Sequence, residues 1–401
     1  MINIINAIMG SGKTTTIFNK IQRKEIPLPV IYITPYLYEA GNGNATGRIQ
    51  EELKDFNFIA PDNLPNKTKH TELLTLQGEN IACTHKLLGN FTAAIINNLK
   101  KNNYTIVIDE AISAFNEIQL KQWDLKLLVE GRHLSIHNTK ELIWNHDSEY
   151  DGKLNYIKNP CKLGTAFLSS VGNNAIIWEY PIALFSSGLD IWIMTYPFDG
   201  TLMKSYLDIH KIPYQLINNK DLGLRDEKEI IEEIIPLLEI YDGKANSIGE
   251  NKYGLSSSNL KKSNSHIQLF RSMYNVFHNI WKCESSKIIW TSFKSAQEKG
   301  APNGLAKRFV PCNLRATNDY KDCTHIMYGV NIFMNPEITK HIKFRGGTFD
   351  QDQYALGEML QLLWRGSIRN GQPMKVFIPS FRMRNLLIGW LNKYNPQDQA
   401  A

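Results

Sequence analysis

The sequence predicts an α/β protein with two doubly wound parallel-sheet domains and an insertion in the first domain. The first observation behind this prediction is a series of short apolar runs, each followed by polar residues and separated from the next by segments with helical patterns. The second is the length of 401 residues, which suffices for two domains of ordinary size. Hydrophobic residues make up 43% of the chain and charged residues 21%, which is typical of a globular protein. No apolar run reaches the roughly 20 residues that a membrane-spanning helix needs.

The first apolar run leads directly into a phosphate-binding sequence. Residues 2–5 are mostly isoleucine, and residues 7–14 read Ala-Ile-Met-Gly-Ser-Gly-Lys-Thr. This segment fits the pattern G-x-x-x-x-G-K-[ST], with Ala7 at the position of the first glycine. A strand before the loop and a helix after it are the context in which such a loop binds phosphate. Because the apolar run opens into the loop and not into a cleavage site, a secretory signal is not expected.

The residue types in this loop suit a nucleoside triphosphate. Gly10 and Gly12 let backbone N–H groups turn inward around phosphate oxygens, because no Cβ stands in the way. Lys13 can then reach the β- and γ-phosphates, and the Thr14 hydroxyl can hold Mg²⁺. The residues expected to contact the nucleotide are Met9, Gly10, Ser11, Gly12, Lys13, Thr14 and Thr15.

Four further apolar runs in the first half predict buried parallel strands. Each run ends in polar residues, and the carboxyl ends of parallel strands share the edge at which doubly wound sheets bind their ligands. The predicted strands and the residues that follow them are 30–33 before Thr34 and Pro35, 80–83 before Thr84 and His85, 104–108 before Asp109 and Glu110, and 191–194 before Thr195.

The acidic pair Asp109 and Glu110 is the second element that points to chemistry. A buried carboxylate is costly unless it is paired or lies near a metal, so two acids that leave an apolar strand need a reason. Hydrolysis of a γ-phosphate needs one carboxylate in the Mg²⁺ shell and a second group that orients the attacking water. Asp109 suits the first task and Glu110 the second.

The second half of the chain repeats the strand pattern. Apolar runs at 287–290 and 375–378 predict two strands, the first followed by Thr291 and Ser292 and the second by Pro379 and Ser380.

These patterns predict two domains, at residues 1–205 and 206–401. The segment at about 130–188 is rich in Asn, Gly and aromatic residues and is interpreted as an insertion in the first domain. Its aromatic side chains either pack a small subdomain or offer stacking platforms to single-stranded bases. The segment at about 242–265 is dominated by Gly, Ser, Asn and Lys and is expected to form a mobile loop.

A third candidate element lies in the second half. Gln361, Arg365 and Arg369 are spaced i, i+4 and i+8 and would share one face of a helix. An arginine supplied to the γ-phosphate stabilises charge in the transition state and contributes about 10³–10⁵ in rate. The alternative is a solvated basic helix face.

Charge points to a polyanionic partner in the second half. Residues 1–200 carry 18 Lys and Arg against 20 Asp and Glu, whereas residues 201–401 carry 27 against 19. A basic excess favours nucleic acid, because neutralised phosphates release counterions. The five cysteines form no C-x-x-C pair, so neither a zinc site nor a disulfide framework is expected, and a reducing cytoplasm is the expected location.

Taken together, the motifs resemble those of superfamily 2 helicases of the DEAD/DEAH-related kind, in a branch common in phages and mobile elements. The resemblance is collinear over nearly the whole chain: residues 7–14 resemble motif I, 34–37 motif Ia, 84–85 the next nucleic-acid motif, 109–112 (Asp-Glu-Ala-Ile) motif II, 195–198 motif III, 290–293 motif IV, 315–320 and 330–336 the motif V region, and 361–369 motif VI. In motif VI, Trp364 replaces the usual glycine and the second arginine comes one residue late.

The resemblance implies an ATP-hydrolysing helicase or translocase with two RecA-like domains and with ATP and Mg²⁺ between them. It implies that Lys13, Asp109, Glu110, Gln361, Arg365 and Arg369 are catalytic and that Thr14 and Asp109 hold the metal. The implied nucleic-acid contacts are Thr34, Pro35, Thr84, His85, Thr291 and Ser292. The implied partner is DNA more than RNA, with replication or recombination proteins as further partners and the host cytoplasm as the location if a phage encodes the chain.

Several alternatives stay open at this point. A DNA-packaging, terminase-like ATPase would need a nuclease in its second half, for which Asp319, Asp322, Asp350 and Asp352 are available. A non-unwinding, ATP-gated nucleic-acid remodeller is the other alternative. His85 is either a catalytic base or structural. Likewise, Arg382 and Arg384 are either backbone contacts or surface charge.

Overall fold

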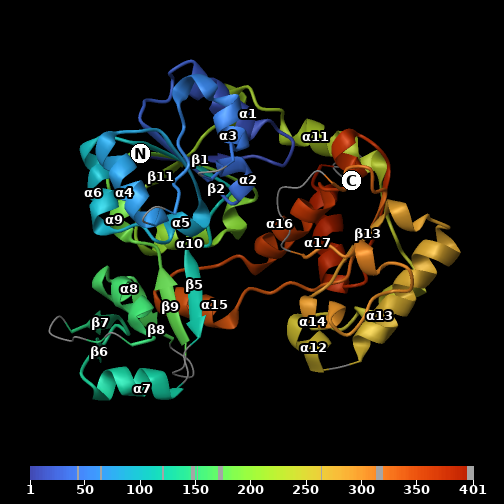
Figure 1. Cartoon of the computed structure of the whole chain (residues 1–401). Coiled ribbons are helices and arrows are strands. Elements are labelled where there is room, and N and C mark those ends of the chain that lie inside the picture. The colour runs from blue at the N-terminus through green and yellow to red at the C-terminus, as the bar shows by residue number, and fades with distance from the viewer. Residues whose placement is uncertain are drawn as a thin grey trace. The chain divides into compact units, whose positions relative to one another are not determined.

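The computed structural model describes residues 1–42, 45–63, 66–119, 122–145, 150, 152–169, 175–262, 264–312 and 319–394. The chain forms two compact units (Figure 1). Unit 1 comprises Met1–Asn6, Lys13–Leu222 and Met334–Asp350, and unit 2 comprises Ala7–Gly12, Gly223–Phe333 and Gln351–Ala401. Both contain a parallel sheet with helices, so the predicted α/β fold class with two doubly wound sheets and an insertion in the first is confirmed.

Unit 1 is built on a six-stranded sheet in which every pair of neighbours is parallel. The strand order is β11-β1-β10-β4-β2-β3. The strands are β1 (Ile2–Asn6), β2 (Val30–Thr34), β3 (Ile81–Thr84), β4 (Thr105–Asp109), β10 (Asp190–Thr195) and β11 (Tyr214–Leu216). The five strands predicted in the first half are confirmed, and their apolar runs are buried because helices cover both faces of the sheet.

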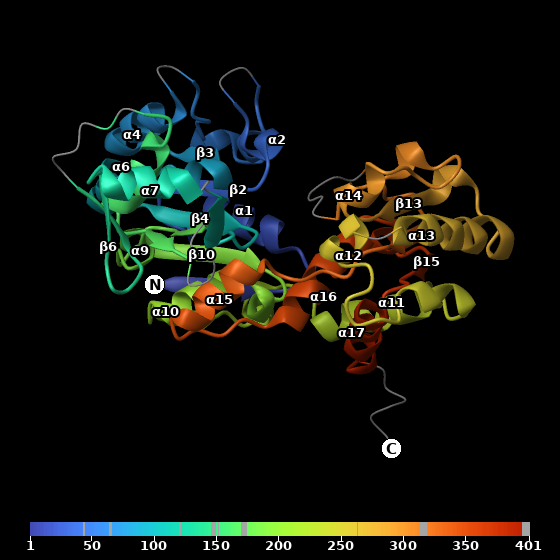
Figure 2. The same ribbon diagram turned by 90° about the horizontal axis from the view of Figure 1, so that it is seen from below.

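The helices of unit 1 lie on both sides of this sheet. Figure 2 shows α6 on one side of β10 and α10 on the other. Their apolar stripes, such as Ile95, Ile96 and Leu99 of α6, face the sheet and are buried. The helices are α1 (Lys13–Gln22), α2 (Leu37–Ala40), α3 (Arg48–Glu52), α4 (Lys67–Gln77), α5 (His85–Leu88), α6 (Ala93–Lys101), α9 (Ile182–Phe185) and α10 (Leu202–Ile209).

The register of the sheet brings the ends of its central strands level. Asn6 at the end of β1 pairs with Thr195 at the end of β10, and Met194 pairs with Asp109. At the other side Thr34 pairs with Thr84. The polar residues that follow five strands therefore gather along one edge of unit 1.

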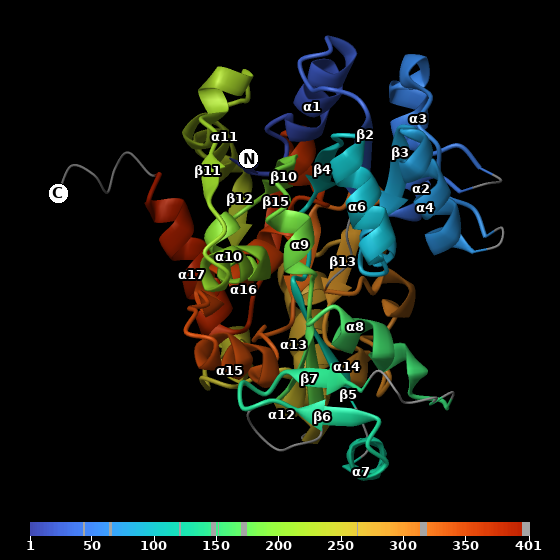
Figure 3. The ribbon, with the colours of Figure 1, turned by 90° about the vertical axis from the view of Figure 1, so that its left-hand side faces the viewer.

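The insertion is a small subdomain with its own core, and it begins earlier than the sequence indicates. It contains an antiparallel sheet β5-β9-β8 (Phe115–Gln119, Ala175–Glu179 and Ala166–Leu168), a hairpin of β6 (Leu134–Ile136) and β7 (Leu142–Trp144), and helices α7 (Gln122–Glu130) and α8 (Lys158–Lys162). Figure 3 shows the hairpin beside α7. Trp144 is buried in this core together with Leu128 and Ile157, which favours the packing role for that aromatic.

One segment of the second half belongs to unit 1. Residues Met334–Asp350 leave unit 2 and return to it, and their helix α15 (Pro336–Phe344) packs against β5 and β9 of the insertion. We call this segment the strap. No feature of the sequence predicts this crossing.

A buried charge cluster fixes the strap. Glu179 of β9 accepts hydrogen bonds from His341 Nε2 at 2.6 Å, His210 Nε2 at 2.8 Å and the Arg345 guanidinium at 2.9 Å. Burial by itself would raise the pKa of Glu179, but the bonds from both histidines and the charge of Arg345 lower it to about 2. The Arg345 guanidinium also lies 4.4 Å from the centre of the Phe167 ring.

Unit 2 is built on a four-stranded parallel sheet in the order β12-β15-β14-β13. Its strands are β12 (Leu238–Ile240), β13 (Ile288–Thr291), β14 (His325–Tyr328) and β15 (Met374–Phe377), of which the sequence predicts β13 and β15. Its helices are α11 (Glu227–Ile234), α12 (Ser257–Lys262), α13 (Ser265–Tyr274), α14 (Lys294–Gln297), α16 (Gln351–Leu363) and α17 (Phe381–Asn392).

The segment at 242–265 differs from the irregular loop that the sequence favours. It forms a 3₁₀ helix at Lys244–Ile248 and the helix α12, and it buries Leu255 and Leu260 in the core of unit 2. Two apolar residues among many polar ones are enough to anchor the segment. Across the described part of the chain, no helix is long and apolar enough to cross a membrane.

Candidate nucleotide site

The phosphate-binding loop has the backbone that its glycines predict. Gly10 and Gly12 have φ angles of +80° and +97°, which side-chain-bearing residues rarely adopt. Helix α1 begins at Lys13, as predicted, so the positive end of its dipole lies at the loop, where it favours an anion. Lys13 and Thr14 are half-buried, whereas Gly10, Gly12 and Thr15 are exposed. Of the other two loop residues expected to contact the nucleotide, Ser11 is buried and Met9 is half-buried.

Asp109 is the residue on which the contacts of this edge converge. Its carboxylate accepts hydrogen bonds from the Thr14 hydroxyl at 3.3 Å and from the buried Tyr32 hydroxyl at 3.1 Å. The Asp109 main-chain oxygen lies 2.9 Å from Nε2 of His85. The structure therefore brings together the two residues that the sequence assigns to a metal, Thr14 and Asp109.

Electrostatics at Asp109 favour a cation. Burial raises the pKa of Asp109 to about 7, and the nearby charges of Glu110 and Glu39 add to this shift. Lys13 and the hydrogen bond from Tyr32 act in the opposite direction, but their effect is smaller. A hydroxyl and a carboxylate are oxygen donors of the kind that Mg²⁺ prefers, so the residues present fit this ion.

Glu110 has a backbone conformation that needs support. Its φ is +62°, in the left-handed region that a residue with a side chain seldom occupies. Such strain costs about 1–3 kcal/mol and persists where the surrounding structure imposes it, often at functional sites. The left-handed conformation of Glu110 changes the direction of the chain directly after Asp109, at the sheet edge where the phosphate loop begins.

The neighbouring strand ends carry the residues expected to contact nucleic acid. Thr34 is fully buried and its hydroxyl donates to Glu39, whose carboxylate also lies 3.9 Å from Arg48. Pro35, Thr84 and His85 are half-buried. Tyr32 and Glu39 are not among the predicted site residues, although a tyrosine inside a buried strand does signal a hydroxyl that needs a partner.

The corresponding strand end in unit 2 is closed to solvent. Thr291 and Ser292 are 0% and 1% exposed. The Ser292 hydroxyl donates to the Gly329 oxygen at 3.4 Å. Both residues thus lie below the surface of unit 2. Residues 315–318 of the expected motif V region lie outside the described residues.

The prediction of one helical face for Gln361, Arg365 and Arg369 is wrong. Helix α16 ends at Leu363, and a turn leads into a 3₁₀ helix at Ser367–Asn370. The turn follows from close packing at Gly366, where a Cβ would lie 2.7 Å from Met374 Sδ and 2.8 Å from Ile326 Cδ1.

The three side chains now differ in their surroundings. Gln361 and Arg365 are half-buried and Arg369 is exposed. The Nε atom of Arg365 is buried and has no hydrogen-bond partner among the described residues. A buried guanidinium nitrogen without a partner is costly, and this feature distinguishes Arg365 from the exposed Arg369.

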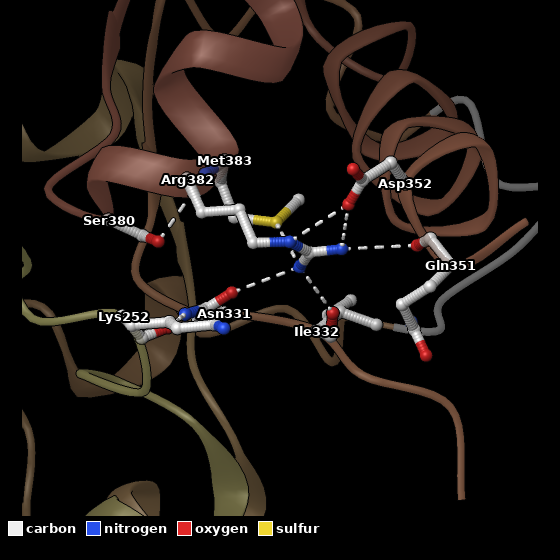
Figure 4. A network of polar contacts seen from close by, with 8 residues as sticks. All are labelled: Lys252, Asn331, Ile332, Gln351, Asp352, Ser380, Arg382 and Met383. Atoms are coloured by element: carbon white, nitrogen blue, oxygen red, sulfur yellow. Dashed lines mark hydrogen bonds and ion pairs between the residues drawn. The ribbon is translucent and has the colours of Figure 1, made fainter.

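Arg382 and Arg384 bind within unit 2. The Arg382 guanidinium pairs with Asp352 at 2.6 Å and donates to the oxygens of Ile332 at 2.8 Å and Gln351 at 3.1 Å (Figure 4). These partners flank the strap, because the chain leaves unit 2 after Phe333 and returns at Gln351. Arg384 donates to the main-chain oxygen of Ile378 at 3.0 Å. Both arginines are thus engaged in holding the fold.

The aspartates of the nuclease alternative do not gather. Asp350 belongs to unit 1 and Asp352 to unit 2, where Asp352 pairs with Arg382. Within the described ranges, no group of three or more His, Cys, Asp or Glu side chains is arranged to hold a metal ion.

Comparisons with known proteins identify the family. Residues 232–391 match the YonV C-terminal Rossmann-like domain, and residues 115–178 match the YonV middle domain, which corresponds to the insertion. The chain is 30% identical to the SPbeta prophage-derived uncharacterized protein YonV of Bacillus subtilis (strain 168), over 97% of this chain and 98% of that protein. A solved structure, the DUF1998 helicase MrfA bound to DNA and AMPPNP, is a distant likeness with 12% identity and a TM-score of 0.33, over 98% of this chain and 48% of that one. The chain belongs to the YonV family.

Proposed function

We propose that this protein is an ATP-hydrolysing motor that acts on nucleic acid, a helicase or translocase of the superfamily 2 kind. The observation that carries the proposal is the meeting of the phosphate loop with Asp109. The Thr14 hydroxyl lies 3.3 Å from the Asp109 carboxylate at the edge where the glycine turns of the loop and the first turn of α1 lie.

In this proposal the phosphate loop, Lys13, Thr14 and the acidic pair Asp109 and Glu110 hold and activate the nucleotide. The loop N–H groups and Lys13 bind the phosphates, and Thr14 and Asp109 hold Mg²⁺, which would neutralise charge on the β- and γ-phosphates. Glu110 orients the attacking water, a role that suits a carboxylate held next to Asp109 by a strained backbone.

Gln361, Arg365 and Arg369 are proposed to complete hydrolysis. Arg365 is the best candidate for the arginine that stabilises the transition state, because its buried Nε has no partner among the described residues. Arg369 is exposed and has less support from its surroundings.

Nucleic acid is the proposed substrate because of charge and position. The basic excess lies in residues 201–401, and polar residues at the strand ends of unit 1, such as Thr84, suit contacts to phosphates and sugars. DNA is proposed ahead of RNA. A terminase-like nuclease has no supporting arrangement among the described aspartates, whereas an ATP-gated remodeller would use the same site.

The test is ATP turnover by the full chain with single-stranded DNA, duplex DNA or RNA at one salt concentration. Lys13→Ala and Glu110→Gln are expected to reduce turnover at least 100-fold and to leave nucleic-acid binding within about twofold. Lys100→Ala, at an exposed position of α6, is the matched control and should turn over ATP normally. An unaffected Glu110→Gln variant contradicts the role of Glu110. Turnover that no nucleic acid stimulates contradicts the motor, and a strand-displacement assay separates a helicase from a remodeller.

A further inference from the structure

We propose that His85 is a positioning residue that couples the strand end at Thr84 to the water-orienting residue Glu110. This inference rests on the proposed function and adds to it a route by which bound nucleic acid controls hydrolysis. Its basis is one hydrogen bond, between His85 Nε2 and the main-chain oxygen of Asp109 at 2.9 Å.

The atom that His85 holds belongs to the peptide group of Glu110. The Asp109 carbonyl and the Glu110 N–H share one rigid plane, so a rotation of that carbonyl turns the backbone of Glu110. Glu110 occupies a left-handed conformation with φ of +62°, which the chain does not adopt by preference. A hydrogen bond to the preceding carbonyl is a direct way to keep it there.

The carboxylate of Asp109 is held separately. Thr14 and Tyr32 donate to its Oδ2 atom at 3.3 and 3.1 Å, and neither bond involves the main chain. A displacement of His85 therefore releases Glu110 and leaves the metal-binding carboxylate in place. This separation predicts an effect on turnover without an effect on ATP binding.

His85 also lies at the right place to sense nucleic acid. It is the first residue of α5 and directly follows Thr84, the half-buried end of β3 at the edge of the sheet. A strand of nucleic acid that binds at Thr84 acts on the beginning of α5 and hence on the His85 ring.

His85 has a second anchor in the segment that follows the insertion. The hydroxyl of Tyr180 donates to the His85 main-chain oxygen at 3.3 Å, and Tyr180 follows Glu179, which the strap residues His341 and Arg345 hold. The backbone of His85 is thus supported by the residue that follows β9, while its ring supports Asp109. In this proposal the ring transmits a shift of α5 to the Asp109 carbonyl.

The experiment compares His85→Phe with His85→Gln in the full chain. Phenylalanine keeps a ring but cannot donate, whereas the glutamine amide can reach and donate to the same carbonyl. For His85→Phe we expect at least a tenfold lower kcat and a loss of stimulation by single-stranded DNA. The KM for ATP should stay within twofold when turnover is measured at saturating DNA, and His85→Gln should recover most of the loss.

His70→Gln is the matched control, because His70 is a half-buried histidine of unit 1 whose Nδ1 contacts Asp62 at 2.8 Å. Its kinetics should equal those of the unchanged protein. If the phenylalanine variant fails to fold, His85→Asn takes its place, since its amide is too short to reach the carbonyl.

The outcomes separate the two proposals. An inactive unchanged protein overturns the proposed function and this inference with it. If the unsubstituted protein is active, two results overturn this inference alone. One is that His85→Phe keeps its kcat and its stimulation by DNA, and the other is that His85→Gln is as impaired as His85→Phe.

Discussion

The two units share a sheet architecture but use the carboxyl ends of their strands differently. In unit 1 the end of β4 carries Asp109, which Thr14, Tyr32 and His85 contact. Its carboxyl pKa is raised, and the strained residue Glu110 lies beside it. In unit 2 the end of β13 is buried, with Thr291 and Ser292 inside the fold. The segment after β15 supplies Arg382 and Arg384, whose guanidinium groups bind neighbouring chain segments.

This difference teaches that a doubly wound sheet fixes where a ligand site can lie and not whether one exists. Unit 1 leaves polar groups and charge imbalance at its edge, which is costly unless a ligand compensates. In unit 2 the end of β13 is closed to solvent, and the buried Thr291 hydroxyl has no hydrogen-bond partner among the described residues. The candidate contribution of unit 2 is instead Arg365, in the turn after α16.

The largest expected effect concerns Arg365. Arg365→Ala is expected to lower kcat for ATP by about 10³–10⁵-fold, the range for an arginine that stabilises the transition state. Arg369→Ala should have a smaller effect, and Arg271→Ala, an exposed arginine of α13, should have none. The measurement is steady-state ATP turnover at saturating nucleic acid. A larger decrease in kcat for Arg369→Ala than for Arg365→Ala would assign the transition-state role to Arg369. It would also weaken the contrast between the sheet edges of the two units.

The next effect concerns the buried charge cluster of unit 1. His341→Ala or Arg345→Ala leaves the buried Glu179 carboxylate with too few partners, and removing one partner of a buried charge costs about 3–5 kcal/mol. Thermal unfolding followed by circular dichroism should show a lower midpoint. Lys343→Ala, an exposed position of the same helix, should leave the midpoint unchanged. Equal midpoints for all three variants would show that the cluster does not hold the strap.

The same cluster has a defined pH dependence. The folded-state pKa of Glu179, about 2, lies below its ordinary value of 4.5. Its contribution to stability is therefore complete above about pH 5 and is lost as the pH falls towards 2. Glu179→Gln should show a flatter stability profile over this range than the unchanged protein, and parallel profiles would contradict the assignment.

A smaller effect is expected at Arg382. Arg382→Ala removes hydrogen bonds to Ile332 and Gln351 and should cost about 2 kcal/mol, with faster hydrogen exchange at 331–333 and 351–352. Because the guanidinium fork makes these bonds, Arg382→Lys should restore little of the loss. Lys261→Ala, at an exposed position of α12, is the control. If Arg382→Ala left hydrogen exchange unchanged but abolished nucleic-acid binding, Arg382 would be a ligand contact and not a structural residue.

The smallest effect tests the contrast itself. Thr84→Val should weaken binding of single-stranded nucleic acid about tenfold, the loss of one hydrogen bond to a charged phosphate. Thr291→Val should change affinity less than twofold, because Thr291 is fully buried. Fluorescence anisotropy at fixed salt measures both. A stronger effect at Thr291 would show that the edge of unit 2 opens to bind nucleic acid.

The sequence predicts the parts of the fold whose signals are local. Buried parallel strands appear as apolar runs, and the phosphate loop is a contiguous motif whose glycines have the expected positive φ angles. The meeting of Thr14 with Asp109 follows from a general property, namely that parallel strands end at one edge.

The sequence misses features that depend on distant packing. The end of α16 is set by the tight fit of Gly366 against Met374 and Ile326, which come from two other strands. The helical spacing of Gln361 and Arg365 in the sequence does not reveal this packing. Likewise, no local pattern in 334–350 tells that His341 will meet Glu179, because the two positions are far apart in the chain.

The strap also sets a timing for synthesis. Unit 1 is not complete until residue 350 has emerged, although most of it is made by residue 222. At typical elongation rates the delay is on the order of ten seconds. During that interval Glu179 lacks its hydrogen bonds from His341 and Arg345, and the β5–β9 face that receives α15 stands uncovered. During synthesis, the first half of the chain therefore stays partly folded until α15, which belongs to the second half, has been made.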